Sequence, residues 1–318
     1  MTIKVSTSII SIQSINQLLS FFYDINEIIC SELLQSTVHD TYLIKTATSK
    51  YIFKVFKYES KSKVEINFEI NFVNYLRTMQ INVSKYLINQ DDNYISEINA
   101  PEGKRYAVLT TYSEGKELKY ENNSDAFEYG VSVGKLHKIS QNFKLLKDKK
   151  EININKMFLE SINIIKIFFE NTNYLSFFEN FEKAIKIKME HIDFDTLKTV
   201  VCHGDLHGGN ANKDLNIISF YDFDFCGYGF ISYDISVFRW GCMIGKRHHL
   251  WKDFIKGYKS VKVLNDTDLE NTLLFVAIRD LWIMSLYLNR VEKMGKLFIS
   301  DLYIKNRINF LKNIQERL

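Results

Sequence analysis

Paired cysteines, long apolar runs and a signal-like N-terminus are all missing from this chain of 318 residues. A chain of this size does not need disulfide staples, and no two of its cysteines have the C-x-x-C spacing, so reduced thiols are expected. The four cysteines are Cys30, Cys202, Cys226 and Cys242. No stretch approaches the roughly 18 apolar residues of a membrane span, and no basic segment with a long apolar core opens the chain. These absences predict a cytoplasmic protein without a membrane partner.

A strong charge of one sign is lacking as well. The formal net charge is +3, a bias too weak to predict nucleic-acid binding. The excess of basic residues lies toward the C-terminus, where residues 231–318 contain 15 Lys and Arg against nine Asp and Glu. A solvated helical surface is the ordinary interpretation of such an excess.

Two kinds of site are excluded by what the motifs lack. The chain has no G-x-S-x-G sequence, so a serine hydrolase is not expected. Cys202, His203, His207 and Cys226 are near one another in sequence, as zinc ligands can be. However, adjacent residues of a strand point to opposite faces, so Cys202 and His203 are not expected to share a zinc ion.

The composition is globular, with 46% hydrophobic and 25% charged residues, and the length suffices for two lobes. Up to residue 110, helical patterns at 14–23 and 63–79 alternate with β-like runs at 41–46, 51–57, 83–88 and 105–110. Helical patterns dominate afterwards, at 126–139, 152–191 with a break near 171–173, 233–245, 251–258, 268–289 and 301–318. The sequence therefore predicts an α+β chain with a small β-rich N-terminal lobe, residues 1–110, and a larger, mostly helical lobe, residues 111–318.

The most informative segment is VCHGDLHGGN at 201–210, followed by YDFD at 221–224. Phosphoryl transfer needs one group that orients the attacking hydroxyl, and oxygen ligands that hold Mg²⁺ against the nucleotide phosphates. In this pattern Asp205 faces the acceptor, while Asn210 and Asp222 supply oxygens to the metal. Asp and Asn beside glycine are also ordinary turn residues, so the joint pattern carries the prediction and neither motif does so alone.

These motifs resemble those of the aminoglycoside phosphotransferase family, which is related to choline kinases, homoserine kinases and bacterial stress-response kinases. The sequences YDIS at 233–236 and VGKLH at 133–137 extend the resemblance. It implies a two-lobed protein-kinase-like fold and Mg·ATP-dependent catalysis. It also implies that Asp205 is the catalytic base or the hydroxyl-orienting group, that Asn210 and Asp222 are Mg²⁺ ligands, and that His203 is structural. Asp234 matches a buried brace of the active-site loops.

In the small lobe, the resemblance implies a phosphate-binding lysine on a strand and a glutamate partner on the following helix. Lys54 stands in the strand pattern at 51–57. Glu65 and Glu69 lie one helical turn apart, and Glu69 has the family's spacing to Leu76, so Glu69 is preferred. Asp224 is either a second acid near the metal or an exposed turn residue.

Three segments are less regular. The loop at 35–41 has no glycine to cover the phosphates, and Ser36 and Thr37 are the candidate donors there. The connector at 109–115 is expected to bind the adenine edge through backbone groups near Thr110 and Tyr112. Residues 211–216 are polar, so the strand after Asn210 is expected to be short and to begin its apolar run only at residue 217.

The function predicted is transfer of the γ-phosphoryl group of ATP to a hydroxyl of a small molecule. A kinase of Ser or Thr in a protein or peptide is the alternative, and an inactive binding module on a kinase fold is the third hypothesis. The basic C-terminal half argues against a polycationic acceptor. Arg239, Arg279 and Asp280 either line the acceptor site or are salt-bridged helix residues.

Overall fold

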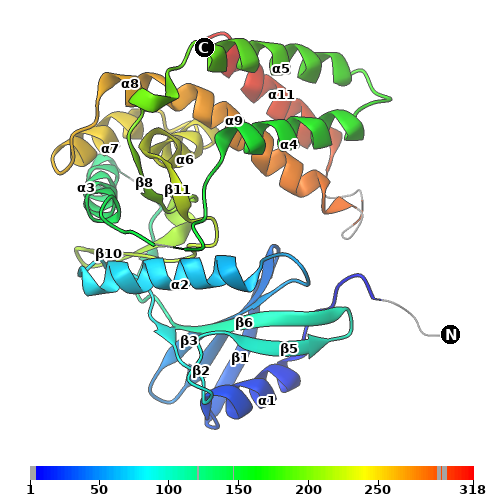
Figure 1. The fold of residues 1–318 in the computed structure, drawn as a ribbon, viewed down its shortest axis with the longest axis vertical. Helices are drawn as coiled ribbons and strands as arrows, with labels where there is room; N and C mark the ends of the chain where they lie inside the picture. Colours follow the sequence, from blue (N-terminus) through cyan, green and yellow to red (C-terminus); the bar gives the residue numbers. More distant parts are fainter. Residues whose placement is uncertain (1–4, 120–121, 146, 292–294, 296–298) are drawn as a thin grey trace. The chain divides into compact units, whose positions relative to one another are not determined.

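The structure is a computed structural model that describes residues 5–119, 122–145, 147–291, 295 and 299–318. The chain divides into two compact units. The first comprises Met1–Glu117, Leu145–Lys149 and Ala211–Asp224, and the second comprises Leu118–Lys144, Lys150–Asn210 and Phe225–Leu318. The first unit is rich in strands and the second is mostly helical (Figure 1), which confirms the predicted α+β class.

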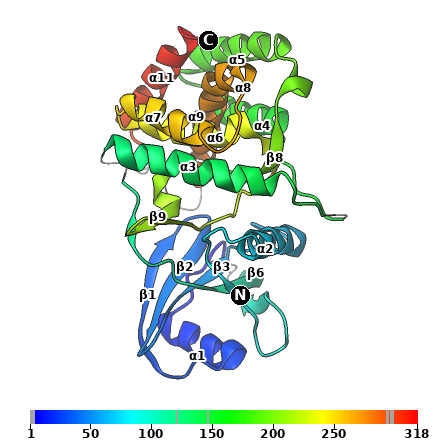
Figure 2. The ribbon, with the colours of Figure 1, turned by 90° about the vertical axis from the view of Figure 1, so that its left-hand side faces the viewer.

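The first unit is built on an antiparallel sheet with strand order β1-β2-β3-β6-β4, in which β5 also pairs with β6. Its elements are α1 (Ile12–Tyr23), β1 (Ile28–Ser36), β2 (His39–Thr46), β3 (Lys50–Phe56), α2 (Lys63–Thr78), β4 (Tyr86–Leu87), β5 (Ser96–Ala100) and β6 (Gly103–Thr111). Helices α1 and α2 lie on opposite sides of this sheet (Figures 1 and 2). A second, three-stranded sheet has the order β10-β9-β7, with β7 at Lys116–Glu117, β9 at Ala211–Asp214 and β10 at Ile217–Phe220.

The core between α1 and the large sheet explains the period-2 pattern of β2 and β3. Ile15 and Leu19 of α1 pack against a cluster that includes Tyr42, Phe53 and Val55, all fully buried. Because alternate residues of a strand face opposite sides, the residue between Phe53 and Val55 points away from α1. That residue is Lys54.

The second unit contains most of the helices. Its elements are α3 (Asn123–Ser140), α4 (Ile154–Phe168), α5 (Leu175–Glu190), η1 (Phe194–Thr196), β8 (Thr199–Cys202), η2 (Gly208–Asn210), β11 (Gly227–Phe230), α6 (Ile231–Ile244), α7 (His249–Lys259), α8 (Asp266–Glu270), α9 (Thr272–Leu288) and α11 (Asp301–Gln315). Strands β8 and β11 pair antiparallel, and residues 203–210 of the VCHGDLHGGN segment follow β8 directly. The predicted break in the helical region 152–191 is confirmed, because α4 ends at Phe168 and α5 begins at Leu175.

Helices α3 and α7 lie side by side (Figure 2), and glycine on each helix permits their close approach. A Cβ atom at Gly130 of α3 would lie 2.0 Å from the backbone oxygen of Phe254, and one at Gly257 of α7 would lie 2.0 Å from that of Phe127. Any larger side chain at either position would force the helices apart.

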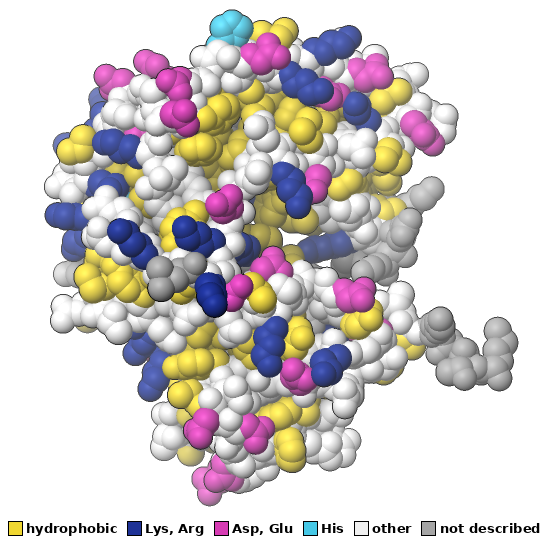
Figure 3. Space-filling model, viewed as in Figure 1, with side chains coloured by type: hydrophobic (Ala, Val, Ile, Leu, Met, Phe, Trp, Pro, Cys, Tyr) yellow, Lys and Arg dark blue, Asp and Glu magenta, His cyan; other side chains and the backbone are white. Residues whose placement is uncertain are grey.

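Helix α9 lies in the core of the second unit. Within the described ranges, the stretch Asp266–Leu288 is long and apolar enough to cross a membrane by length and composition, but 72% of its most apolar window is buried. That burial is typical of a core helix. On the face drawn in Figure 3, Lys and Arg side chains are interspersed with Asp and Glu, as the small net charge leads one to expect.

Candidate functional site

The predicted site residues are divided between the two units. Lys54, Glu69 and Asp222 belong to the first unit, whereas Asp205 and Asn210 belong to the second. The expected meeting of Asp205, Asn210 and Asp222 around one ion therefore stays a prediction. The geometry within each unit shows what each set of side chains can do.

In the first unit, Lys54 is joined to both acidic residues of the YDFD motif. Its Nζ lies 2.7 Å from Oδ1 of Asp222 and 2.8 Å from Oδ1 of Asp224. The side chains of Lys54 and Asp224 are 11% and 5% exposed, but that of Asp222 is 26% exposed, so Asp222 alone is open to an incoming ligand. Asp222 also has a φ of 63°, an uncommon left-handed conformation for a residue other than glycine.

The charges in this cluster hold one another in the ionised state. Burial opposes the charged form of Lys54, but the carboxylates of Asp222, Asp224 and Glu69 outweigh burial and keep the pKa of its ammonium above the ordinary value. Burial likewise opposes the carboxylate of Asp224, but Lys54 and Lys61 outweigh it and hold the Asp224 pKa well below the usual range. Lys54 and Asp224 therefore both keep their charges at neutral pH.

Glu69 is buried, and its ion-pair partner differs from the one predicted. In the described part of the first unit, its carboxylate pairs with Nζ of Lys61 and accepts a hydrogen bond from the hydroxyl of Tyr86, rather than pairing with Lys54. Glu65, the other candidate, closes the capping box at the start of α2. Lys54 instead pairs with the acids of the YDFD turn, which lie within hydrogen-bonding distance of its ammonium.

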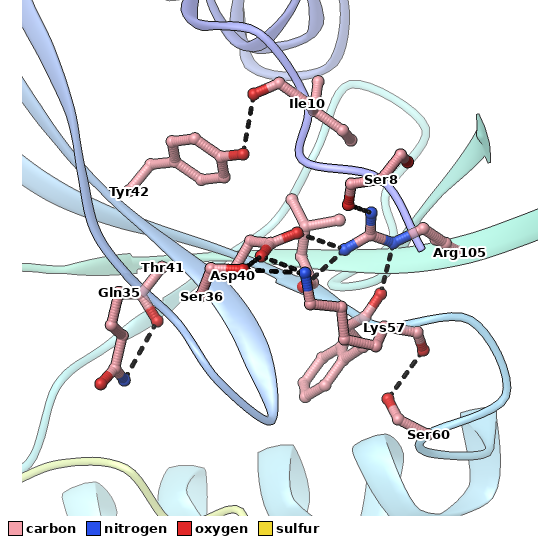
Figure 4. Close-up of polar contacts among 12 residues, drawn as sticks. Ser8, Ile10, Gln35, Ser36, Asp40, Thr41, Tyr42, Lys57, Ser60 and Arg105 are labelled. Carbon is pink, nitrogen blue, oxygen red and sulfur yellow. Dashed lines mark hydrogen bonds and ion pairs between the residues drawn. The ribbon is translucent and has the colours of Figure 1, made fainter. Parts of the chain in front are cut away.

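The glycine-free loop is the tip of the β1–β2 hairpin, and Ser36 is engaged there by charged neighbours (Figure 4). The Ser36 hydroxyl donates to Asp40 at 2.6 Å and accepts from Nζ of Lys57 at 2.9 Å. Asp40 also pairs with the buried guanidinium of Arg105 at 2.6 Å. The N–H of Thr37 donates to the backbone within the hairpin turn. Both predicted phosphate donors thus serve the hairpin itself in this structure.

His39, in the same loop, reaches the YDFD motif. Its Nδ1 lies 2.7 Å from Oδ2 of Asp224. The ring is buried, and its Nε2 has no hydrogen-bond partner among the described residues. His39, Asp222 and Asp224 each present a potential ligand atom within 4.8 Å of the others, so these three side chains could hold a cation together.

The connector residues use their backbone groups within the sheet. Thr110 is paired with Ile52 of β3 on one side and with Tyr86 of β4 on the other. The N–H of Tyr112 donates to the carbonyl oxygen of Lys50 at 3.1 Å. The adenine contacts predicted for Thr110 and Tyr112 stay predictions.

In the second unit, a buried carboxylate braces the loop that follows β8. Asp234 accepts hydrogen bonds from the backbone N–H groups of His203, at 2.7 Å, and Gly204, at 2.9 Å, and its Oδ2 is 2.9 Å from Nε2 of His137. Gly204 has a φ of 83°, and a Cβ there would lie 2.2 Å from the backbone oxygen of Phe225. Only glycine fits this turn, and Asp234 fixes the turn in place. These contacts match the bracing role predicted for Asp234.

Asp205 follows this braced turn, and its two carboxylate oxygens have different partners. Oδ1 is in contact with Nη2 of Arg279. Oδ2 accepts from Nδ2 of Asn210 at 3.1 Å and lies 3.4 Å from Nε2 of His207. Burial raises the pKa of Asp205, but Arg279, His207 and His203 together outweigh burial and hold the pKa well below its usual range. Asp205 is thus an oriented carboxylate that keeps its charge.

The side-chain oxygen of Asn210 is free to act as a ligand of a hard divalent cation. The amide nitrogen of Asn210 donates to both the backbone oxygen and the carboxylate of Asp205, at 3.0 and 3.1 Å. This network assigns Nδ2 to Asp205 and leaves Oδ1 of Asn210 as the atom available to a ligand. Amide and carboxylate oxygens are the ligands that Mg²⁺ prefers.

Sequence reasoning missed four contributors to these clusters: His39, Lys61, Tyr86 and the contact of Arg279 with Asp205. Lys61 immediately precedes the N-cap of α2, and its Nζ also lies 5.2 Å from the ring centre of Phe56. No motif marks any of the four, because each contact depends on how the chain folds rather than on a fixed spacing. Arg279, for example, is separated from Asp205 by 74 positions.

Comparison with known proteins agrees with this geometry. A model described as the phosphotransferase enzyme family (APH) matches residues 31–263. The protein sll1119 of Synechocystis sp. is 26% identical over 281 residues, which are 87% of this chain and 77% of that protein. A protein of Deinococcus radiodurans is 26% identical over 297 residues, which are 90% of this chain and 84% of that one.

Similar folds occur among solved kinase structures. The amicoumacin kinase hAmiN, in complex with AMP-PNP, Ca²⁺ and Ami, has a TM-score of 0.77 at 18% identity, over 97% of this chain and 94% of that one. A microcompartment-associated aminopropanol kinase also has 0.77 at 18% identity, over 96% and 95%. The choline kinase LicA from Streptococcus pneumoniae has 0.69 at 15% identity, over 96% and 99%. These similarities confirm the predicted kinase-like fold.

Proposed function

We propose that this chain, which belongs to the phosphotransferase enzyme family, transfers the γ-phosphoryl group of ATP to a hydroxyl group of a small molecule. The observation that carries the proposal is the state of Asp205. Its carboxylate is held ionised by Arg279 and fixed by Asn210, in a turn braced by Asp234. A fixed carboxylate of this kind can accept a hydrogen bond from an acceptor hydroxyl and orient it for attack.

Lys54 and Glu69 are the proposed nucleotide residues. Lys54 is a buried ammonium that keeps its charge, and such a group can bind nucleotide phosphates when they are present. Glu69, through its pair with Lys61, adds a third carboxylate to the two lysines and two aspartates of the cluster. The similar hAmiN kinase was solved with AMP-PNP, which supports ATP as the phosphoryl donor.

Magnesium is the proposed metal, with Asn210 and Asp222 as its protein ligands. Bound Mg²⁺ would neutralise phosphate charge and so stabilise the transferring phosphoryl group. Asp205 would hold the acceptor hydroxyl while its oxygen forms a bond to the γ-phosphorus and the bond from that phosphorus to the ADP oxygen breaks. The hydroxyl proton would pass to Asp205 or to solvent. Its low pKa favours the orienting role, because a strongly acidic carboxylate is a weak base.

A small-molecule acceptor is supported by the similar structures, which are named as kinases of amicoumacin, aminopropanol and choline. These names describe those proteins. For this chain they favour a hydroxyl compound of low molecular mass over a peptide.

The test is a panel assay with γ-labelled Mg·ATP, amino alcohols, sugars, antibiotics and Ser- or Thr-containing peptides. We expect label on one class of small molecule, and loss of about 99% or more of that transfer in Asp205→Asn. Asp195→Asn, a change of an exposed aspartate in the same unit, is the matched control and should keep full activity. Label on peptides would instead support a protein kinase. Wild-type protein that binds nucleotide but labels no acceptor would support an inactive binding module.

A further inference from the structure

Arg279 of α9 is a buried arginine whose guanidinium ends on the catalytic loop. The residue is 1% exposed. Its Nη2 contacts Oδ1 of Asp205, and its Nη1 lies 3.5 Å from the backbone oxygen of Gly204. The fork of the guanidinium therefore faces both the side chain of the proposed catalytic residue and the backbone immediately before it.

Two tryptophan rings restrict where this guanidinium can go. Its Cζ lies 4.5 Å from the ring centre of Trp282 and 5.8 Å from that of Trp240. Both rings are themselves held, since Nε1 of Trp240 donates to Asp280 at 2.8 Å and Trp282 packs edge-on against Phe225 at 4.7 Å. Contacts of a cation with aromatic faces are attractive and also limit side-chain motion.

This arrangement assigns the two oxygens of Asp205 to different tasks. Oδ1 is occupied by Arg279, so rotation of the carboxylate would break a contact between two buried charges. Oδ2, which Arg279 leaves to other partners, accepts from Asn210 and lies 3.4 Å from Nε2 of His207, in a side chain that is 13% exposed. A planar fork fixes such a rotation, whereas the single ammonium of a lysine does not.

We propose that Arg279 is a positioning residue, which fixes the rotamer of Asp205 so that one carboxylate oxygen always faces the acceptor. The inference rests on the proposed function, because it needs Asp205 to orient a hydroxyl. It goes beyond the motifs of the loop, since Arg279 lies on a distant helix. The competing role is structural, in which the buried ion pair serves the fold alone.

The experiment compares Arg279→Lys with the wild type in phosphate release from Mg·ATP, with water as the acceptor and no other ligand needed. We expect kcat to fall about 100-fold, because a misplacement of about 1 Å costs this much, while KM for ATP stays within about twofold. Arg307→Lys is the matched control. Its guanidinium also lies over an aromatic ring, 5.2 Å from the ring centre of Phe310, and also pairs with a buried carboxylate, but that carboxylate belongs to Asp280 rather than to Asp205. That variant should keep kcat within about threefold of the wild type.

A double-mutant cycle separates positioning from folding. If Arg279 acts through the carboxylate, Arg279→Lys should change kcat less than about twofold in an Asp205→Asn background. Equal losses in both backgrounds, or a well-folded Arg279→Lys variant with wild-type kcat, would overturn the proposal.

Arg279→Gln, which keeps a hydrogen-bond donor and most of the side-chain length, gives a second series of variants with a different effect on packing. Failure of both variants to fold, judged by thermal unfolding, would assign Arg279 to the fold and equally reject the proposal. Wild-type protein that releases no phosphate and labels no acceptor would refute the proposed function instead.

Discussion

Replacing Asp280 with asparagine should remove a specific pH dependence of stability from the second unit. Asp280 is fully buried on α9, where Oδ1 accepts from Nε1 of Trp240 at 2.8 Å and from Nη1 of Arg307 at 2.7 Å. Its Oδ2 is buried without a hydrogen-bond partner among the described residues. Burial raises the pKa of this carboxyl from 3.8 to about 6, although Arg307 and Trp240 oppose the rise. The titration of Asp280 in the folded protein therefore falls in a pH range in which unfolding can be measured.

The size and sign follow from the difference between folded and unfolded proteins. Between pH 4 and 6 the folded protein holds a proton on Asp280 that the unfolded chain has released. Stability contributed by this group is therefore present at low pH and lost as pH rises through about 6. A rise of roughly two pKa units corresponds to about 3 kcal/mol, because each unit is worth 1.36 kcal/mol. Asparagine keeps the Oδ1 acceptor and cannot ionise, so this loss should disappear.

The assay is denaturant unfolding of wild type and Asp280→Asn at pH 4, 5, 6 and 7. The free energy of unfolding of the wild type, relative to the variant, should fall by about 2 kcal/mol across this range, because the unfolded carboxyl is already partly ionised at pH 4, and should then stay constant above pH 7. Exposed Asp195→Asn is the control and should follow the wild type at every pH. The reasoning would be refuted if the difference in free energy of unfolding between the wild type and Asp280→Asn did not change with pH. It would also be refuted if this difference shifted in favour of the wild type as the pH rises.

Two further predictions concern packing and charge. Gly130→Ala should lower the free energy of unfolding by at least about 2 kcal/mol, because the new Cβ would lie 2.0 Å from a backbone oxygen of α7. Gly241→Ala should raise the free energy of unfolding by up to about 1 kcal/mol, because the new Cβ meets no described atom within 4 Å. Thermal unfolding distinguishes the two, and equal shifts would contradict the close helix packing. Lys61→Met should cost about 3 kcal/mol by leaving the buried carboxylate of Glu69 without this partner, but exposed Lys63→Met should cost less than about 0.5 kcal/mol. Denaturant midpoints measure both, and a neutral Lys61→Met would show that the Glu69 pair is dispensable.

Local patterns in the sequence were sufficient for most of the elements. Helices α1, α2, α3 and the α4–α5 break follow their apolar periodicity, and β2 and β3 follow alternation around Phe53 and Val55. The orientation of Lys54, away from α1, follows from the same alternation. The contact of Asp234 with the loop after β8 follows from the family resemblance. The sequence therefore predicted the fold class, which the solved relatives confirm.

Segments whose structure depends on backbone pairing were harder to predict. β1 was not predicted, because it is an edge strand whose side chains are mostly exposed or half-buried and show no clean alternation. The polar stretch after Asn210 was expected to delay the strand, but β9 begins at Ala211 because it pairs with both β10 and β7. Hydrogen bonds between strands do not depend on apolar side chains, so composition could not reveal this strand.

Partners within the clusters were the least predictable, because each depends on tertiary distances of a few ångströms. Glu69 had the expected helix position, yet Lys61 and Tyr86 reach it instead of Lys54. Arg279 could only be described as a salt-bridged or acceptor-lining residue. Its role as the partner of Asp205 emerges once α9 is seen beside the loop after β8.

The carboxylates of Asp205 and Asp222, one in each unit, are paired with chemically different cations. Asp205 is paired with an arginine, whose charge is permanent and whose planar fork is confined by two aromatic rings. Asp222 is paired with Lys54, a single ammonium on a flexible stem, and its side chain is 26% exposed. The pairing with Arg279 fixes the orientation of the Asp205 carboxylate. The pairing with Lys54 leaves Asp222 able to exchange the ammonium for another cation. A divalent cation that binds Asp222 must compete with this ammonium, and nucleotide phosphates would offer the ammonium another anionic partner. We therefore expect metal and nucleotide to favour each other's binding, each strengthening the affinity for the other by the same factor.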